Sequence, residues 1–562
     1  RLLGNPYQEY ISPKMVQAEA PVVMVMMFLL IFSSIFFVLR SMAAVISTFA
    51  VTVLTITAAF GSVGLMGSSL NQMVVTYPIL IITLALADCV HLFSIYFQQR
   101  DMGKTTEEAM KRSLELNLQP LFLTTITTCI GFLSFNVLEV LPLRDLGNGI
   151  SVGVFLAFVF TIFFVAPLIS FFNVKIPKTT QKQMDISRKI ASLSLTNGKT
   201  FLWLVPLICF LLISLIPFNK LEENPTQMYS ENYTSFGPDT LWLDEKLGVT
   251  FPISFKAVSE NGSVSSPEFL ESLDKFSTWL EKQEEVNHVT SLARTMKSLN
   301  KSMHGDDLEM KVIPDDQALS SQYLFFYEMS LPMGLDLNTS ISQDRGSTKL
   351  SAFLKDMTSS EYLVFQEKVK YYLKDNNLNS SISEPAGFRV VFSYLMEAIV
   401  ISLLSGVAIG LALIVLIIGL FFRSTTFGFL SSFPNILPIV SAFGVWAILN
   451  GQVGFMVAVG MGSTLGIIVD FTVHLLSKYD LARREMKKSP EESIFFAFEA
   501  VGFALLAMTV ILAIGFSVLH INSFLPLHDF AQFSIIAFVL ALLIDFFFFP
   551  NLLVRFDKRK FG

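Results

Sequence analysis

Of the 562 residues in the chain, 52% are hydrophobic and only 15% are charged, whereas soluble globular domains carry about 25% charged residues. The composition therefore indicates a polytopic α-helical membrane protein, and the formal net charge of −6 argues against nucleic-acid binding. The three cysteines, Cys89, Cys129 and Cys209, lie singly in apolar stretches, which excludes a disulfide framework or a CxxC metal site.

Eleven apolar stretches are long enough to cross a bilayer, whose hydrocarbon core of about 30 Å needs roughly 20 helical residues. They occur near 18–39, 43–66, 73–97, 119–138, 147–172, 201–217, 393–422, 426–449, 453–477, 501–520 and 530–554. Lys and Arg gather in the loops at 100–112, 175–199, 478–488 and 555–560. Because basic loops stay on the cytoplasmic side, the polar stretch between the sixth and seventh spans is expected outside.

This polar stretch, 219–388, has the composition of a soluble domain. Its patterns predict strands at 250–258, 287–292, 347–354 and 382–391. Helices are predicted at 267–284, 295–303, 315–330 and 360–375. Without the two middle helices the order is βαββαβ, which predicts an extracytoplasmic ferredoxin-like α+β domain.

The apolar part of the chain repeats itself. At an offset of 383, Arg40-Ser41 matches Arg423-Ser424, and Ala59-Phe60-Gly61 matches Ala442-Phe443-Gly444. At an offset of 384, Gly131-Phe132 matches Gly515-Phe516, and Pro142-Leu143-Arg144-Asp145 matches Pro526-Leu527-His528-Asp529. We therefore expect two transmembrane repeats of one plan.

That plan is one helix, an outer domain and five more helices, so twelve spans are implied although eleven are visible. The sequence is thus expected to be truncated at its N-terminus. Six spans in each repeat return the chain to its starting side, so the repeats should be parallel and related by an axis along the membrane normal. The predicted organisation is the tail of a first outer domain at 1–15, a first transmembrane repeat of five spans at 16–173, a cytoplasmic linker at 174–200, the first helix of the second repeat at 201–218, the outer domain at 219–388, five spans at 389–556 and a cytoplasmic tail at 557–562.

Two spans carry acidic residues that stand out because a charge inside a membrane is costly and usually marks an ion or proton pathway. Asp88 and His91 lie three residues apart, and Asp470 and His474 four apart, so each pair shares a helical face. No Lys or Arg is expected deep in any span to neutralise these carboxylates. We predict that the four residues form a proton relay; the alternative is that they only hold helices together through hydrogen bonds.

Small and hydroxylated residues accompany the predicted relay. Gly462 and Gly466 continue the four-residue steps of the ninth span, which predicts close helix packing beside the relay. Thr125 and Thr509, at matching repeat positions, are candidates for a polar track, although a threonine in a helix more often bonds its own backbone.

One further acidic residue, Asp545, lies in an apolar span, but an offset of 383 places it opposite Ile162, so we expect a structural role for it. The spans contain no HExxH, GxSxG or Walker sequence. We therefore expect neither an enzyme nor ATP use, no metal and no cofactor. The proton gradient would supply the energy, and membrane lipids would be the surroundings and partners.

The segments Gly466-Ile-Ile-Val-Asp470-Phe-Thr-Val-His474, Ala87-Asp88-Cys-Val-His91 and Thr124-Thr125-Ile-Thr-Thr-Cys-Ile-Gly131-Phe132 resemble the resistance-nodulation-division (RND) superfamily. They are most similar there to MMPL-type exporters and to sterol-sensing-domain (SSD) proteins such as Patched. The resemblance implies an antiporter of the cytoplasmic (inner) membrane that uses the proton-motive force to export hydrophobic or lipid-like substrates. A non-transporting sterol or lipid sensor is the alternative.

One departure from the MMPL pattern concerns the residue after each relay aspartate. Many MMPL members have tyrosine there, whereas this chain has Cys89 and Phe471. The departure gives more weight to the two histidines as relay partners.

Overall fold

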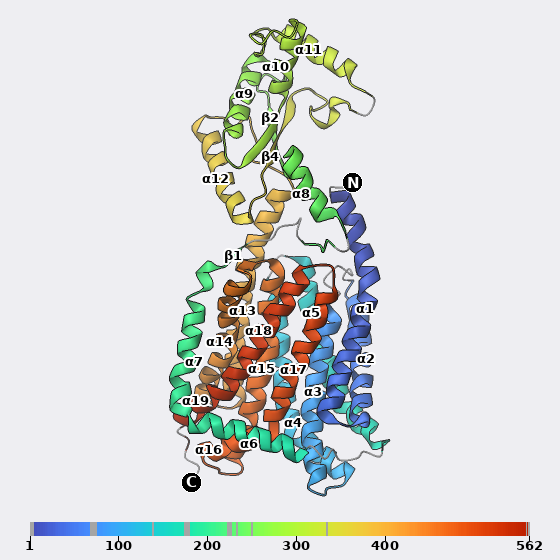
Figure 1. Ribbon diagram of the computed structural model, residues 1–562, viewed down its shortest axis with the longest axis vertical. Helices are drawn as coiled ribbons and strands as arrows, with labels where there is room; N and C mark the ends of the chain where they lie inside the picture. Colours follow the sequence, from blue (N-terminus) through green and yellow to red (C-terminus); the bar gives the residue numbers. More distant parts are fainter. Residues whose placement is uncertain are drawn as a thin grey trace. The chain divides into compact units, whose positions relative to one another are not determined.

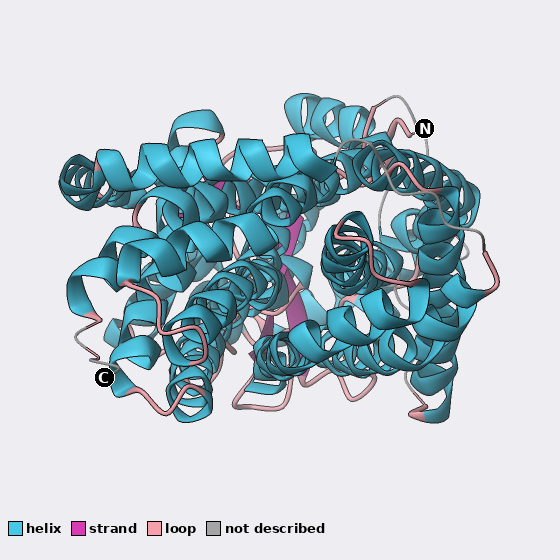
Figure 2. Cartoon of the chain, turned by 90° about the horizontal axis from the view of Figure 1, so that it is seen from below, coloured by secondary structure: helices cyan, strands magenta, loops and turns pink. Residues whose placement is uncertain are grey.

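The computed structural model describes residues 5–67, 76–137, 140–172, 180–221, 228–231, 234–248, 251–332, 335–557 and 559. Two compact units divide the chain, one built from Leu221–Ala398 and the other from Asn5–Lys220 and Ile399 onward. Most of the described chain is helical (Figure 2). Eleven helical segments among the described residues are long and apolar enough to cross a membrane, which confirms the expected polytopic helical protein.

The unit made of Asn5–Lys220 and Ile399 onward holds a bundle of long helices (Figure 1). They are α1 Asn5–Leu39, α2 Met42–Leu65, α3 Thr76–Asp101, α4 Thr106–Leu133, α5 Leu141–Ser170, α7 Gly198–Ile213, α13 Phe388–Phe421, α14 Thr425–Leu449, α15 Phe455–Arg484, α17 Phe503–Ser517 and α18 Pro526–Phe547. Shorter elements are α6 Thr180–Thr196, α16 Pro490–Ala497, α19 Phe549–Phe556 and the two-residue strands β1 Lys220–Leu221 and β5 Gln452–Val453. Helix α6 lies across the lower ends of the bundle helices (Figure 1).

Helix starts recur at the offsets found in the sequence. Ser41 and Ser424 are the N-caps of α2 and α14, and the side chain of each accepts a hydrogen bond from the backbone N–H three residues later. Thr105 and Ser489 both form capping boxes, at the starts of α4 and α16. Equivalent capping signals therefore begin equivalent helices, while the relation of the repeats by one axis stays a prediction.

The unit Leu221–Ala398 contains a three-stranded antiparallel sheet in the order β2-β4-β3. Its strands are β2 Phe251–Val258, β3 Val286–Thr290 and β4 Ser347–Leu354, and its helices are α8 Phe236–Leu247, α9 Pro267–Glu281, α10 Leu292–Met303, α11 Gln317–Ser330 and α12 Ser359–Asp375. Side chains from strands and helices together form one apolar core, which includes Phe255, Phe276 and Phe365.

The expected fourth strand at 382–391 is wrong. Only isolated bridges form there, from Ile382 and Ala386 to β2, and α13 begins at Phe388. Pro385 has no N–H to contribute to a ladder. Gly387, with a φ of 152°, then takes a conformation that favours glycine where the extended stretch turns into the helix.

Candidate functional site

Helices α3 and α15 are the most enclosed spans of the bundle. In the most apolar 18-residue window, 94% of residues are buried in α3 and 100% in α15, compared with at most 67% in any other candidate span. A helix that is apolar on all sides is expected in the interior of its bundle. Any ionisable side chain in the middle of these two helices is therefore shielded by protein.

Two histidines meet face to face at this position. His91 of α3 and His474 of α15 have ring centroids 3.6 Å apart and planes only 6° from parallel, and both are almost fully buried. They lie at an offset of 383 in the sequence. The stack therefore joins the two halves of the chain through equivalent residues.

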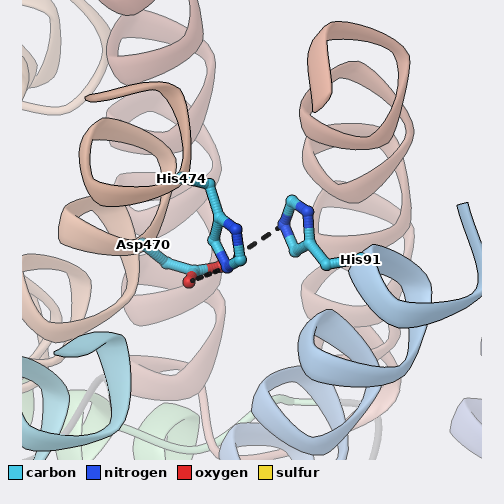
Figure 3. Close-up of side chains that lie close together, drawn as sticks. All are labelled: His91, Asp470 and His474. Atoms are coloured by element: carbon cyan, nitrogen blue, oxygen red, sulfur yellow. Dashed lines mark ion pairs between the residues drawn. The ribbon is translucent and has the colours of Figure 1, made fainter. Parts of the chain in front are cut away.

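Asp470 lies beside both rings (Figure 3). Its Oδ1 is 3.2 Å from Nε2 of His474, one helical turn away, and its Oδ2 is 3.9 Å from Nε2 of His91. The first distance is that of a close ionic contact, and the second is too long for a direct hydrogen bond. The carboxylate thus lies closer to the histidine of its own helix than to that of α3.

Several polar atoms of this cluster have no hydrogen-bond partner among the described residues. They are both ring nitrogens of His91, both ring nitrogens of His474 and Oδ2 of Asp470. Buried polar atoms without partners are costly, so they are rare and mark strained or functional positions. The hydrogen-bonding capacity of these atoms is therefore unused within the described part of the chain.

The fourth predicted relay residue, Asp88, lies outside the cluster. Asp88 is buried, with 8% of its surface exposed, and no described side chain donates a hydrogen bond to it. Among the described residues, ring nitrogens of His91 and His474 and a carboxylate oxygen of Asp470 lie within 4.8 Å of one another, and Asp88 is not part of this group. The structure thus brings three of the four residues together.

Comparisons with known protein families match both halves of the chain. A family model described as Patched SSD matches residues 19–171, and the model of the MMPL family matches residues 267–560, more than half of the chain. The chain belongs to the MMPL family. The two matches indicate a transporter or sensor of RND type for lipids, in a family of transporters and not of enzymes. A comparison with curated proteins finds no match.

The two glycines predicted to allow close packing, Gly462 and Gly466, lie against the 3-10 turn Ser134–Val137 and helix α4, respectively. A Cβ at Gly462 would fall 2.2 Å from Cε1 of Phe135, and Cα of Gly466 lies 3.1 Å from where a Cβ at Gly131 would be. Thr128 donates a hydrogen bond of 2.7 Å to the Gly466 carbonyl. Four residues turn a helix by about 400°, so each step of four along α15 moves the side chain about 40° around the helix axis. This drift carries the row of residues from α4, which Gly466 contacts, to α3, whose His91 lies near Asp470.

Thr125 and Thr509 lie apart from the histidine cluster in their contacts. The hydroxyl of Thr125 donates to the Leu121 carbonyl at 2.7 Å, and that of Thr509 donates to the Leu505 carbonyl at 3.0 Å. Both bonds run to the preceding turn of the same helix, which is the usual partner of a helical threonine. A polar track through Thr125 and Thr509 stays a prediction, and the hydrogen bonds of their hydroxyls do not link them to the histidine cluster.

A buried lysine next to the cluster escaped the sequence analysis. Helix α15 runs on to Arg484, so Lys478 is helical, buried and one turn beyond His474. Its Nζ donates to the Leu116 carbonyl at 2.6 Å and to Oδ1 of Asn117 at 3.3 Å, and Asn117 in turn donates to the His91 carbonyl. The sequence analysis did not anticipate a buried cation here, although the four-residue steps of α15 that join Gly462, Gly466, Asp470 and His474 lead to Lys478.

The donor set of the cluster, two imidazoles and one carboxylate, is one that first-row transition metals accept. The lone pair of an imidazole nitrogen lies in the plane of its ring, however, and the rings of His91 and His474 are parallel at 3.6 Å. Their lone pairs therefore cannot converge on one ion in this arrangement. This arrangement therefore does not suit an ion held by both imidazoles.

Proposed function

We propose that this MMPL-family protein is a proton-motive-force-driven exporter, an antiporter of RND type for hydrophobic or lipid-like substrates. The observation that carries the proposal is the enclosed cluster of His91, Asp470 and His474, which joins the two halves of the chain with unpartnered proton-binding atoms. Neither ATP nor a cofactor has a part in this proposal.

Electrostatics suggests how a proton changes the structure. With one proton in the cluster, an imidazolium lies beside the Asp470 carboxylate and is stabilised by it. With a proton on both rings, two positive charges 3.6 Å apart repel each other by about 5 kcal/mol at an effective dielectric constant near 20. Protonation and deprotonation would thus change how firmly α3 and α15 are held together.

The remaining parts of the proposal concern topology. We place the basic loops in the cytoplasm and the chain in the cytoplasmic (inner) membrane, with two parallel repeats. The 219–388 region would then be an extracytoplasmic porter-like domain. Its strand order β2-β4-β3, with 382–386 bridging β2 on the other side, supports a ferredoxin-like arrangement.

Reconstituted vesicles test the function. The full chain in sealed liposomes should move a fluorescent lipid analogue when a pH gradient is imposed, and the pH gradient should dissipate faster when that substrate is present. Equal flux with and without the gradient would contradict proton coupling. Mass spectrometry of lipids that copurify with the protein would give the first natural substrate candidates.

A second function is favoured by the Patched SSD match over 19–171. As a sensor, the bundle would bind a sterol or lipid and signal to a partner without moving it. In the same vesicles a sensor would bind the lipid analogue but show no flux under any gradient.

A further inference from the structure

A second buried polar cluster lies on the opposite side of α15. Asp545 of α18, Thr472 of α15 and Asn435 of α14 are all completely buried. The Thr472 hydroxyl oxygen is 3.1 Å and 3.4 Å from the two carboxyl oxygens of Asp545, and 3.3 Å from Oδ1 of Asn435. Three helices thus place oxygen atoms around one point.

The hydrogens in this cluster can be counted. Thr472 has one hydroxyl hydrogen, Oδ1 of Asn435 has none, and an ionised Asp545 has none. The amide orientation is set because Nδ2 of Asn435 donates to the Ser431 carbonyl at 2.7 Å, and a flipped amide would place two carbonyl oxygens at that distance. An ionised Asp545 would leave one of the two oxygen contacts of Thr472 without a hydrogen.

A proton on Asp545 gives Thr472 one hydrogen bond with each of its two partner side chains. The carboxyl O–H then donates to the Thr472 oxygen, and the Thr472 O–H donates to Oδ1 of Asn435. A chain of this kind has one hydrogen between Asp545 and Thr472 and one between Thr472 and Asn435, and it avoids burying a carboxylate with no cation beside it. The arrangement therefore corresponds to the neutral acid.

No counter-charge reaches Asp545 among the described residues. None of the charged or titratable groups on α18 itself and on the elements packed against it lies within hydrogen-bond or ion-pair distance of its carboxyl group. These groups are His528 and Asp529 on α18, Asp470, His474, Lys478, Tyr479, Asp480, Arg483 and Arg484 on α15, His520 on the turn after α17, Glu499 on the π-helical turn before α17, Lys182, Asp185, Arg188 and Lys189 on α6, Lys199 and Cys209 on α7, and Arg555 on α19, while α14 and α17 have none.

The first half of the chain has an uncharged version of this cluster. Cys89 matches Thr472 at an offset of 383, and its Sγ lies 3.7 Å from the hydroxyl of Thr161. Thr161 therefore corresponds to Asp545, at an offset of 384, in place of the Ile162 expected from the sequence. The buried small residues of α5 and α18 agree with this offset: Gly147 with Ala531, Gly153 with Ala537 and Ala157 with Ala541.

We propose that Asp545, together with Thr472 and Asn435, is a second proton-binding site that exists only in the second half of the chain and exchanges its proton as α15 moves. Thr472 follows Asp470 by two residues, so the two side chains point about 200° apart around α15. Any rotation or slide of α15 that changes the Asp470 contacts also changes the Thr472 contact with Asp545. The inference rests on the proposed proton coupling for its role in transport, although proton binding itself can be measured separately.

The test uses the full chain in nanodiscs and in vesicles. Asp545→Asn should keep the fold, because the amide can donate to Thr472 as the protonated acid does. It should remove the infrared C=O band of a buried neutral carboxylic acid and lower the protons exchanged per protein by about one. Lipid-analogue transport should be lost, because the site is then permanently in its proton-loaded form.

Thr161→Val is the matched control and should leave the band and transport unchanged. The proposal is overturned if Asp545→Asn retains the band, or if the variant transports at the normal rate with the normal number of protons per substrate. It is also overturned if the band appears only after sodium is removed, since the ligand is then Na⁺. Full transport by relay variants such as Asp470→Asn would contradict the proposed function but would leave the band assignment to Asp545 intact.

Discussion

Helices α3 and α15 lie at matching positions in the sequences of the two halves of the chain, yet they differ in what surrounds their acidic residue. On α15, Asp470 lies beside both histidines, and buried Thr472 and Lys478 make further polar contacts. On α3, Asp88 lies outside the cluster of His91, Asp470 and His474, and Cys89 contacts the hydroxyl of Thr161. Matching positions of the two halves thus hold acidic residues in unequal surroundings.

The spacing between Asp and His is one physical cause of the difference. Four residues, as between Asp470 and His474, turn an α-helix by about 400°, whereas three, as between Asp88 and His91, turn it by about 300°. The side chains of Asp470 and His474 therefore point about 40° apart around the helix axis, whereas those of Asp88 and His91 point about 60° apart in the opposite sense. With the histidines in contact, only one aspartate is directed at them.

Neutralising Asp88 or Asp470 should have the largest effect on transport, and it should show whether the two aspartates differ in their contact with the histidines. Both Asp470→Asn and Asp88→Asn are expected to abolish proton-driven transport while the protein stays folded and inserted, as judged by gel filtration. Only Asp470→Asn should also change the ¹⁵N NMR shifts of the histidine rings, because only Asp470 contacts them. Normal transport by both variants would rule out the relay.

The two histidines should differ in the size of their effects. His474→Gln removes the closer partner of Asp470 and should slow transport by about 10²-fold or more, in the range of a lost general acid or base. His91→Gln, which removes the partner at 3.9 Å, should cost less. The double variant should be no slower than His474→Gln, because residues that act as a unit are not additive. Initial rates under one imposed gradient measure all three, and additive effects would contradict a shared proton.

Two glycine substitutions, one on α15 and one on α2, test whether α15 is packed more closely against its neighbours than α2 is. Gly462→Ala would place a methyl group against the Phe135 ring and should destabilise the protein by about 1–3 kcal/mol. Gly64→Ala on α2 is the control, since nothing lies within 4 Å of its added Cβ. Thermal unfolding in detergent should show a lower midpoint for the first variant only; equal midpoints would argue against tight packing at this position.

The smallest effect is expected at the end of α15. Arg100 and Arg483 match at an offset of 383, and each donates to a lysine carbonyl, but Arg483 also pairs with Asp557 at 3.0 Å. Burial opposes ionisation of Asp557, but hydrogen bonds from Arg559 and Arg483 outweigh it and lower its pKa from 3.8 to about 2. Because the folded pKa is depressed, the stabilisation is complete above about pH 4 and is lost as the pH falls to about 2.

Asp557→Asn should accordingly cost about 1–2 kcal/mol at pH 7, after allowance for solvent screening. The variant and the unmodified protein should become equally stable near pH 2. Thermal unfolding at the two pH values measures the difference, and a difference that persists at pH 2 would show that packing, and not charge, is responsible.

The sequence by itself determined the membrane class, the eleven spans and the position of the buried acidic residues, because hydrophobicity and capping residues act locally along the chain. It also placed three strands of the smaller unit within two residues, and β2 and β4 most closely because they have strong local patterns. The fourth strand failed because Pro385 and Gly387 act on the backbone against an otherwise favourable pattern.

Only the tertiary structure decided which polar groups meet. The His91–His474 stack, the contact of Thr472 with Asp545 and the burial of Lys478 each depend on a neighbouring helix that is remote in the sequence. A spacing defines the face of a helix, but the partner on that face depends on how the helices pack. For this reason Asp545, which matches an isoleucine in the sequence comparison, corresponds by its contact with α15 to Thr161, whose hydroxyl contacts Cys89 of α3. Asp88, an apparent equal of Asp470, lies outside the histidine cluster.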